Sequence, residues 1–200
     1  MAATVVRYLR QVGAPTSAEP VEALPRPELR AVGEDERAPL DPGEFRRVLG
    51  HFASGVTIVT APSDEPDGPP AGFACQSFSS LSLDPPLVAF MVARTSTTWP
   101  RIAAAGVFCV NILGADQGTV CRSFAVSGAD KFAGVEHDPT PVTGSPVLAG
   151  VPAWIDCTIH AVHTGGDHLI VVGKVEALGT ADGECSPLLF HQGKFGRFEA

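Results

Sequence analysis

The sequence has few basic residues and no long apolar run. It contains 14 lysines and arginines against 22 aspartates and glutamates, which gives a net charge of −8. Because nucleic acids and anionic membranes favour basic faces, we expect no nucleic-acid partner and no membrane partner. The first residues lack the apolar core of a secretory signal, and no later apolar run reaches the roughly 20 residues that span a bilayer.

Paired metal-binding and redox motifs are also missing. The five cysteines are odd in number and include no Cys-x-x-Cys pair, so we expect reduced, mostly buried thiols in a cytoplasmic protein. His160 and His163 lie three apart in a predicted strand and would point to opposite faces, so they cannot chelate one ion together. We therefore predict no metal site.

Three nucleotide and nucleophile motifs are absent: Gly-x-Gly-x-x-Gly, Gly-x-x-x-x-Gly-Lys and Gly-x-Ser-x-Gly. Their absence disfavours a Rossmann dehydrogenase and an α/β hydrolase.

A hydrophobic fraction of 44% over 200 residues suffices for one well-buried domain. Residues 11–40 are rich in Pro, Ala, Glu and Arg without apolar periodicity, so we expect residues 1–40 to be a mobile tail and residues 41–200 to form the domain.

A helix signal opens this domain. Asp41 is placed as its N-cap and Pro42 as its first residue. Phe45, Val48, Leu49 and Phe52 share one face, which predicts that the helix docks on the core and ends at Gly55. The β-branched run 56–60 then predicts a strand, and the Pro/Asp/Gly run 62–70 predicts a surface turn.

The rest of the domain reads as strands with two short helical segments, near 99–105 and 117–124. The strand-like runs are 87–92, 107–112, 154–163 and 168–178. This pattern favours a closed antiparallel barrel over a parallel sheet. In the third run apolar residues alternate with Asp156, Thr158 and His160, which predicts a half-exposed strand. Residues 164–167 then predict a tight hairpin turn.

Two neighbouring segments suggest a ligand. Small residues and hydroxyls crowd into 72–82, where a flat ring such as a flavin can lie against backbone amides, although a small-residue loop leading into a strand has the same composition. Ser96, Thr97 and Thr98 precede a helix that starts near Pro100, where hydroxyls and first-turn amides can face a phosphate. Ordinary helix capping is the alternative, and Arg94 or Arg101 would add charge to a phosphate site.

Several motifs in succession carry a family resemblance over roughly residues 41–198. They are FRRVLGHFASGVTIV (45–59), GFACQSFSSLSLDPPLV (72–88), STTW (96–99), FCVNIL (108–113), DKFAG (130–134), GDH (166–168) and PLLF (187–190). In order and spacing the chain resembles the short-chain NAD(P)H:flavin oxidoreductases, the reductase components of two-component flavin-dependent monooxygenases. The FACQSF motif is similar to that of reductases whose partner hydroxylases act on phenols.

The resemblance implies a mainly β fold with small flanking helices, an FMN-binding split β-barrel of the six-stranded type. It implies an NAD(P)H-dependent flavin reductase that uses FMN or FAD with NADH, NADPH being the open alternative. It also implies a homodimer and a partner monooxygenase that receives reduced flavin by diffusion. A flavoenzyme with tightly bound FMN that reduces another acceptor, and a non-catalytic flavin-binding or redox-sensing module, are the alternatives.

The residues implied for the flavin are Ala74, Cys75, Gln76, Ser77, Ser80, Thr95, Ser96, Thr97, Thr98, Lys131 and Phe132. Those implied for NAD(P)H are Gly166, Asp167 and His168. The backbone of Ala74 to Ser77 is expected to direct hydride transfer without any acid or base. Cys75 is interpreted as a small apolar side chain behind the flavin rather than a catalytic thiol. The alternatives without a role in ligand binding are that Lys131 is an ordinary surface lysine and that His168 is an exposed histidine in a turn.

Overall fold

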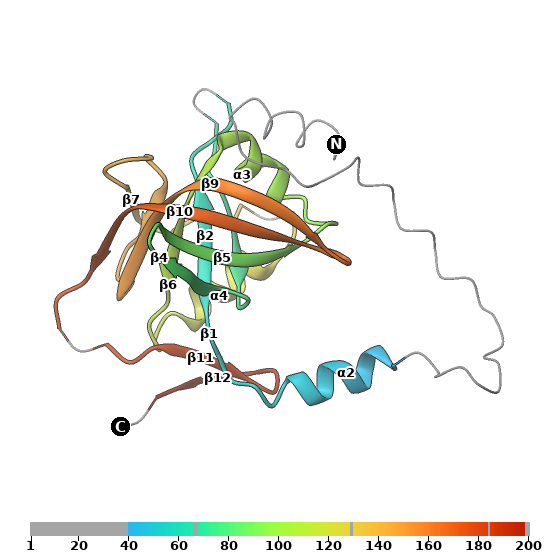
Figure 1. Cartoon of the computed structure of the whole chain (residues 1–200). Helices are drawn as coiled ribbons and strands as arrows, with labels where there is room; N and C mark the ends of the chain where they lie inside the picture. The colour runs from blue at the N-terminus through green and yellow to red at the C-terminus, as the bar shows by residue number, and fades with distance from the viewer. Residues whose placement is uncertain (1–39, 66–67, 129, 184, 199–200) are drawn as a thin grey trace.

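The fold is built on one antiparallel sheet of seven strands (Figure 1). A computed structural model describes residues 40–65, 68–128, 130–183 and 185–198, so the predicted tail lies outside the described residues except for Leu40. The strand order is β3-β2-β6-β9-β10-β5-β4. The bounds are β2 Thr57–Ala61, β3 Ala71–Cys75, β4 Ser79–Leu83, β5 Pro86–Ala93, β6 Val107–Ile112, β9 Ala153–Gly165 and β10 His168–Thr180.

Five of these strands and two helices were predicted from the sequence, and all seven are confirmed. The helices are α3 (Trp99–Ala105) and α4 (Gly118–Ala125). The strands β3 and β4 were not predicted, because glycine, serine and alanine are weak strand formers. Pairing with β2 holds such residues of β3 in the sheet. The paired positions run from Ala71 opposite Ala61 to Cys75 opposite Thr57.

The ladder does not close into a complete barrel. The strands β3 and β4 stand at the two ends of the order and do not pair with each other. The prediction of a closed barrel is therefore wrong in this respect, and the sheet has seven strands rather than six. Residues 76–78 connect the two end strands. Across the gap, the Met91 amide donates to Ser77 Oγ and this hydroxyl donates to the Met91 carbonyl, each over 2.9 Å.

Two apolar clusters flank this opening. The first fills the barrel and centres on Phe90, whose ring contacts those of Phe73, Trp99 and Phe108. The second lies around α4 and includes Ile58, Leu113, Phe124, Leu148 and Leu188. Both clusters contain residues of β3, with Cys75 in the first and Ala74 packed against the second. The side chains of β3 thus separate the two halves of the core.

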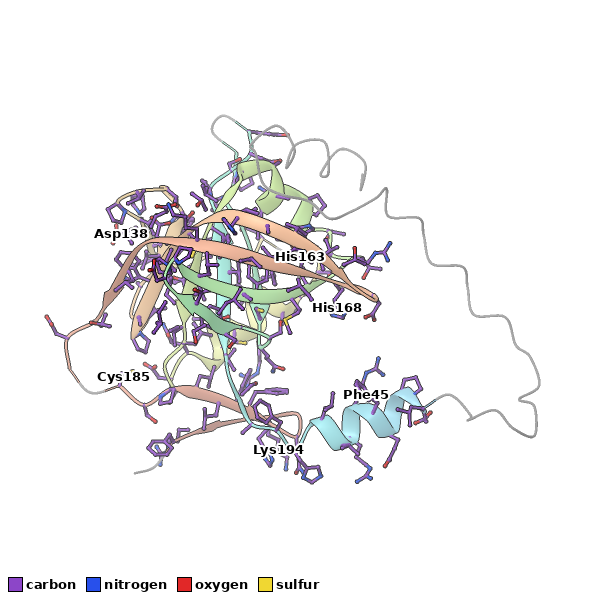
Figure 2. All side chains as sticks on the ribbon, viewed as in Figure 1. Phe45, Asp138, His163, His168, Cys185 and Lys194 are labelled. Atoms are coloured by element: carbon purple, nitrogen blue, oxygen red, sulfur yellow. The ribbon has the colours of Figure 1, made fainter. Side chains whose placement is uncertain are left out.

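The helix α2 (Pro42–Leu49) begins as predicted but does not dock on the core. The Asp41 carboxylate accepts the Glu44 amide over 2.8 Å, and the helix ends at Leu49 with Gly50 as its C-cap, not at Gly55. Its apolar side chains stay 53% to 54% exposed, and Phe52 is 81% exposed. In Figures 1 and 2 the helix and its Phe45 project away from the barrel.

A second, small sheet determines the direction of α2. It has the order β1-β11-β12, with bounds Ser54–Gly55, Leu188–His191 and Lys194–Arg197. The Gln192 amide, in the turn between β11 and β12, donates to the Gly50 carbonyl over 3.1 Å. The hairpin therefore holds the end of α2 beside the C-terminal strands, which the apolar spacing of α2 does not reveal.

The predicted hairpin of β9 and β10 is confirmed, with Gly166 at φ 68° in its two-residue turn. Its predicted face pattern is only partly right. A register shift leaves His160 opposite no residue of β10, so Ala161 and Val162 are both buried. Asp156, expected on the polar face, is fully buried and accepts hydrogen bonds from the Thr143 amide (3.0 Å) and the Thr143 hydroxyl. These bonds compensate for its burial.

The hairpin that carries Thr143 packs against the barrel through polar side chains. Its strands are β7 (His137–Pro139) and β8 (Pro146–Leu148). Asn111 of β6, which is fully buried, accepts the Leu148 amide over 2.8 Å and donates to the Pro146 carbonyl over 3.3 Å. The hairpin also adds apolar residues to the second cluster, in which Leu148 is buried and against which Val147 packs.

Candidate functional site

A cavity of about 680 Å³ opens where the sheet ladder is interrupted. Its wall gathers ten of the fourteen predicted site residues: Ala74, Cys75, Gln76, Ser77, Thr95, Ser96, Thr97, Thr98, Lys131 and His168. Four predicted residues do not line it: Ser80, Phe132, Gly166 and Asp167. The segments that the sequence marked as flavin seat, phosphate site and nicotinamide turn therefore meet in one place.

The seat is the end of β3 and the residues just after it. Gln76 and Ser77 lie beyond the ladder of β3 with β2, so their amides are not used in strand pairing. The Thr57 hydroxyl donates to the Cys75 carbonyl over 2.9 Å, and Ser77 is bonded to Met91, so both sides of this short segment are fixed. The seat is thus a rigid piece of backbone with small side chains, which suits close approach by a flat ring.

Cys75 has the properties of a packing residue. Its side chain is 5% exposed, and its Sγ lies 3.4 Å from Ser77 Oγ. Burial raises the pKa of the Cys75 thiol, which disfavours the thiolate that nucleophilic chemistry requires. These features support the interpretation of Cys75 as a small apolar side chain at the base of the seat.

The three hydroxyls before α3 have different partners. Ser96 Oγ accepts the Trp99 amide over 3.1 Å, so capping of the helix uses this hydroxyl. Thr98 stands at the N-cap position without a side-chain capping bond, and its Oγ1 instead accepts from Lys131 Nζ over 3.4 Å. Thr97 is exposed and lines the cavity. Helix capping alone therefore accounts for one of the three.

Lys131 brings a cation to these hydroxyls. Its Nζ also donates to the Gly72 carbonyl over 3.0 Å, so the side chain bridges β3 and the start of α3. Burial lowers the pKa of Lys131, because the ammonium has lost part of its hydration. An anionic group placed here would replace that lost solvation. The bonds of Lys131 contradict its reading as a plain surface lysine.

The two arginines considered for the phosphate do not line the cavity. Arg101 points to the loop before β3, where it pairs with the Asp64 carboxylate over 3.4 Å and donates to the Pro69 carbonyl. Arg94 donates to the Gly166 carbonyl over 3.3 Å. The structure therefore does not place either guanidinium group in the cavity wall, because backbone and carboxylate acceptors on neighbouring loops hold them.

His168 is the part of the Gly-Asp-His turn that reaches the cavity. It opens β10 near the tip of the long hairpin (Figure 2), and its Nδ1 lies 2.8 Å from Asp167 Oδ1. This hydrogen bond, together with the histidine's charge, lowers the pKa of Asp167. Asp167 itself is exposed, and its carbonyl accepts the Arg94 amide over 3.0 Å. Gly166 supplies the turn and Asp167 orients the imidazole.

Two residues expected at the flavin lie elsewhere. Ser80 is exposed on β4, and its strand pairs with β5 away from the cavity wall. Phe132 packs edge-on against the rings of Phe124 and His137, with centroids 5.0 and 5.3 Å away. Phe132 thus supports the second apolar cluster, and its neighbour Lys131 is the residue of this motif that reaches the cavity.

Sequence reasoning missed the apolar part of the wall. Most of this part comes from the β1–β2 junction, α4 and the C-terminal hairpin, and the rest from β3 and β5: Val56, Cys121, Phe124, Ala125, Phe190 and Phe195, with Phe73, Met91, Val92 and Ala93. The PLLF motif contains Phe190 and was a usable signal, whereas nothing in the sequence marks Phe195.

Among the described residues no three His, Cys, Asp or Glu side chains are grouped so that they could hold a metal ion. The helices of the described ranges are all too short or too polar to cross a bilayer.

Comparison with known proteins gives consistent matches. Residues 49–199 match the flavin reductase like domain. The chain is 47% identical over 160 residues to the reductase subunit HsaB of a flavin-dependent monooxygenase from Rhodococcus jostii, covering 80% of each protein. A homologue of nitrilotriacetate monooxygenase component B from Mycobacterium thermoresistibile superposes with a TM-score of 0.74 at 49% identity, covering 78% of this chain and 86% of the other. The NADH:FAD oxidoreductase SgcE6 of Streptomyces globisporus, solved with NAD and FAD fragments, gives 0.73 at 35% identity, covering 82% and 98%.

Proposed function

The chain belongs to the flavin reductase family, as its motifs predicted, and we propose that its cavity brings NADH and a flavin together for hydride transfer. The reduced flavin then serves a separate flavin-dependent monooxygenase. The observation that carries this proposal is the meeting of three segments at one cavity: the backbone seat after β3, the hydroxyl cluster with Lys131, and His168. The split-barrel fold class also agrees with the matched structures.

The seat fits an isoalloxazine ring. A flavin held here would supply the chemistry, the acceptance at N5 of a hydride from nicotinamide C4. The residues Ala74 to Ser77 present backbone and small side chains to the cavity, with Cys75 and Ser77 fixed from behind. Backbone N–H groups aimed at the ring stabilise the negative charge that arrives with the hydride. The chain's work at this end is alignment and electrostatics.

The hydroxyl cluster fits the flavin phosphate. The Thr97 and Thr98 hydroxyls offer donors and Lys131 offers a positive charge within the same wall. The ammonium has three N–H donors, of which the Gly72 carbonyl and Thr98 Oγ1 take two, so the third would be available to a phosphate oxygen. Such charge-assisted bonds are stronger than neutral ones and favour FMN or FAD over riboflavin.

His168 fits the nicotinamide nucleotide. With Nδ1 protonated, the imidazole donates a hydrogen bond to the Asp167 carboxylate, which leaves Nε2 as the nitrogen for a ligand. A nicotinamide amide or a nucleotide phosphate are both suitable partners. Because burial holds the Cys75 pKa above its ordinary value and Lys131 is engaged with Gly72 and Thr98, no acid or base is assigned to the hydride step.

One assay tests this function against its alternatives. Purified protein should oxidise NADH only when free flavin is added, and the rate should saturate with flavin. Yellow protein that reduces another acceptor without added flavin would favour a tightly bound cofactor. Binding of flavin without NADH oxidation would favour a redox-sensing module. The same assay with FMN, FAD, NADH and NADPH determines the preferred pair.

The oligomeric state is a further part of the proposal. Phe45, Val48 and Leu49 of α2, with Phe52 just after the helix, form an exposed apolar surface that is suited to cover a second copy of the chain. The free thiols favour a cytoplasmic location. Light scattering should give the mass of a homodimer. Replacing Phe52 with aspartate should shift the mass toward the monomer; an unchanged dimer would assign the interface to another surface.

A further inference from the structure

Two phenylalanines of the C-terminal hairpin form an aromatic wall of the cavity. Phe190 of β11 and Phe195 of β12 are direct cross-strand partners, and their ring centroids lie 5.6 Å apart at 67°. Both rings are half-buried, and both line the cavity. We propose that the Phe190–Phe195 pair, the aromatic wall, is the surface against which the isoalloxazine ring packs. This inference rests on the proposed function and adds the residues that select for the ring.

The hairpin that carries the wall is anchored to the barrel. Leu188 is 2% exposed in the second apolar cluster, and its amide donates to the Leu113 carbonyl over 2.9 Å. The Ala115 amide donates to the Ser186 carbonyl over 2.8 Å. Because these bonds tie β11 to the end of β6, the rings are held in a fixed position relative to the cavity. A rigid wall loses little entropy when a flat ligand packs on it.

The helix α4 supports Phe195 from the other side. The Arg122 guanidinium carbon lies 5.2 Å from the Phe195 ring centroid. The first residue of α4, Gly118, also lies against the ring, and a Cβ there would be at ordinary contact distance, 3.4 Å. Phe195 is thus held between α4 and the cavity.

The position of the wall favours isoalloxazine over nicotinamide. Phe190 and Phe195 pack against the second apolar cluster, as does Ala74, the first residue of the backbone seat. By contrast, His168 stands on β10, which pairs with β9 and β5 and with no strand of the small sheet that carries the wall. The dimethylbenzene end of isoalloxazine is an apolar aromatic edge, and such edges pack well on an angled pair of rings. Nicotinamide carries a polar amide and, once oxidised, a positive charge.

Steady-state kinetics of Phe195→Leu test the wall. The KM for riboflavin should rise about three- to tenfold, the loss expected for one aromatic contact. FMN and FAD should show the same factor because they share the ring, and the KM for NADH should stay unchanged. Phe198→Leu is the matched control, since Phe198 lies just beyond β12, is 60% exposed and does not line the cavity.

Three outcomes would overturn the proposal. A rise in the KM for NADH alone would place the nicotinamide on the wall. Unchanged flavin kinetics would remove Phe195 from the site, and an equal loss in Phe198→Leu would mean a general effect on the hairpin. If the wild-type protein itself fails to oxidise NADH with riboflavin, FMN and FAD alike, the proposed function fails instead.

A direct contact measurement does not depend on the leucine variant folding. Phe195→Trp keeps an aromatic ring on the wall, and its fluorescence should be quenched by riboflavin more strongly than that of Phe198→Trp. Both variants share the native Trp99 and Trp154, so the difference reports the new side chain. Equal quenching in the two variants would refute the contact. Phe195→Trp should also keep a KM for riboflavin near that of the wild type.

Discussion

Lys131→Met tests the phosphate site most sharply, because it removes the charge and keeps most of the length of the unbranched side chain. Lys131 Nζ has two acceptors, the Gly72 carbonyl at 3.0 Å and Thr98 Oγ1 at 3.4 Å. One charge-assisted bond to a phosphate contributes about 1.5 to 3 kcal/mol, which corresponds to a loss of roughly 10- to 150-fold in FMN affinity. Riboflavin has no phosphate, so its affinity should change only by the structural cost of the lost bridge.

Titration of FMN and riboflavin by fluorescence quenching, on wild type and variant, separates the two effects. The pKa of Lys131 is lowered from 10.5 by burial, so the ammonium loses its proton at a lower pH than a free lysine. FMN binding should therefore weaken more steeply than riboflavin binding as pH rises toward 10.5, because only FMN carries the phosphate that the ammonium would hold. Lys131→Arg, which keeps the charge, is the control. Equal losses for FMN and riboflavin in Lys131→Met would refute the assignment of the phosphate.

Three further substitutions probe the remaining parts of the site. His168→Ala should raise the KM for NADH severalfold and leave flavin affinity nearly unchanged; normal NADH kinetics would remove His168 from the site. Cys75→Ala should keep kcat within about twofold, because a buried thiol with a raised pKa is no nucleophile, and a large loss would assign it a chemical role. Ser77→Ala should lower stability by about 1 to 3 kcal/mol, because it leaves the Met91 amide and carbonyl without the serine hydroxyl; an unchanged urea midpoint would contradict this.

Most of the barrel could be predicted from local sequence patterns. The β-branched and alternating runs predicted the five strands correctly, and Gly166 with its neighbours predicted the long hairpin. The strand β3 escaped because its residues are small, and they stay in the sheet through pairing with β2. Such pairing is a long-range property that no window of sequence reports.

The site shows the same division between local and long-range information. Local composition was enough to indicate the hydroxyls at 96–98 and the small residues after β3 as candidate site residues. The positions of the Arg101 and Lys131 side chains could not be predicted in this way, because each depends on an acceptor on a distant segment. This acceptor is Asp64 for Arg101 and Gly72 for Lys131. The failed docking of α2 has a similar cause, because its apolar spacing reports a face but not what covers it.

The gap in the sheet ladder has a mechanical consequence. Since β3 is paired only with β2 and β4 only with β5, the width of the gap depends on side-chain bonds across it rather than on strand register. Ser77 makes such bonds to Met91, with the Cys75 thiol approaching the same carbonyl at 4.0 Å. The Ser77–Met91 hydrogen bonds therefore hold the two sides of the gap together, and a ligand bound in the gap would stabilise these bonds. Adding flavin should then slow hydrogen exchange at the Met91 amide, even though the flavin does not pair with β3 or β4 as a further strand would.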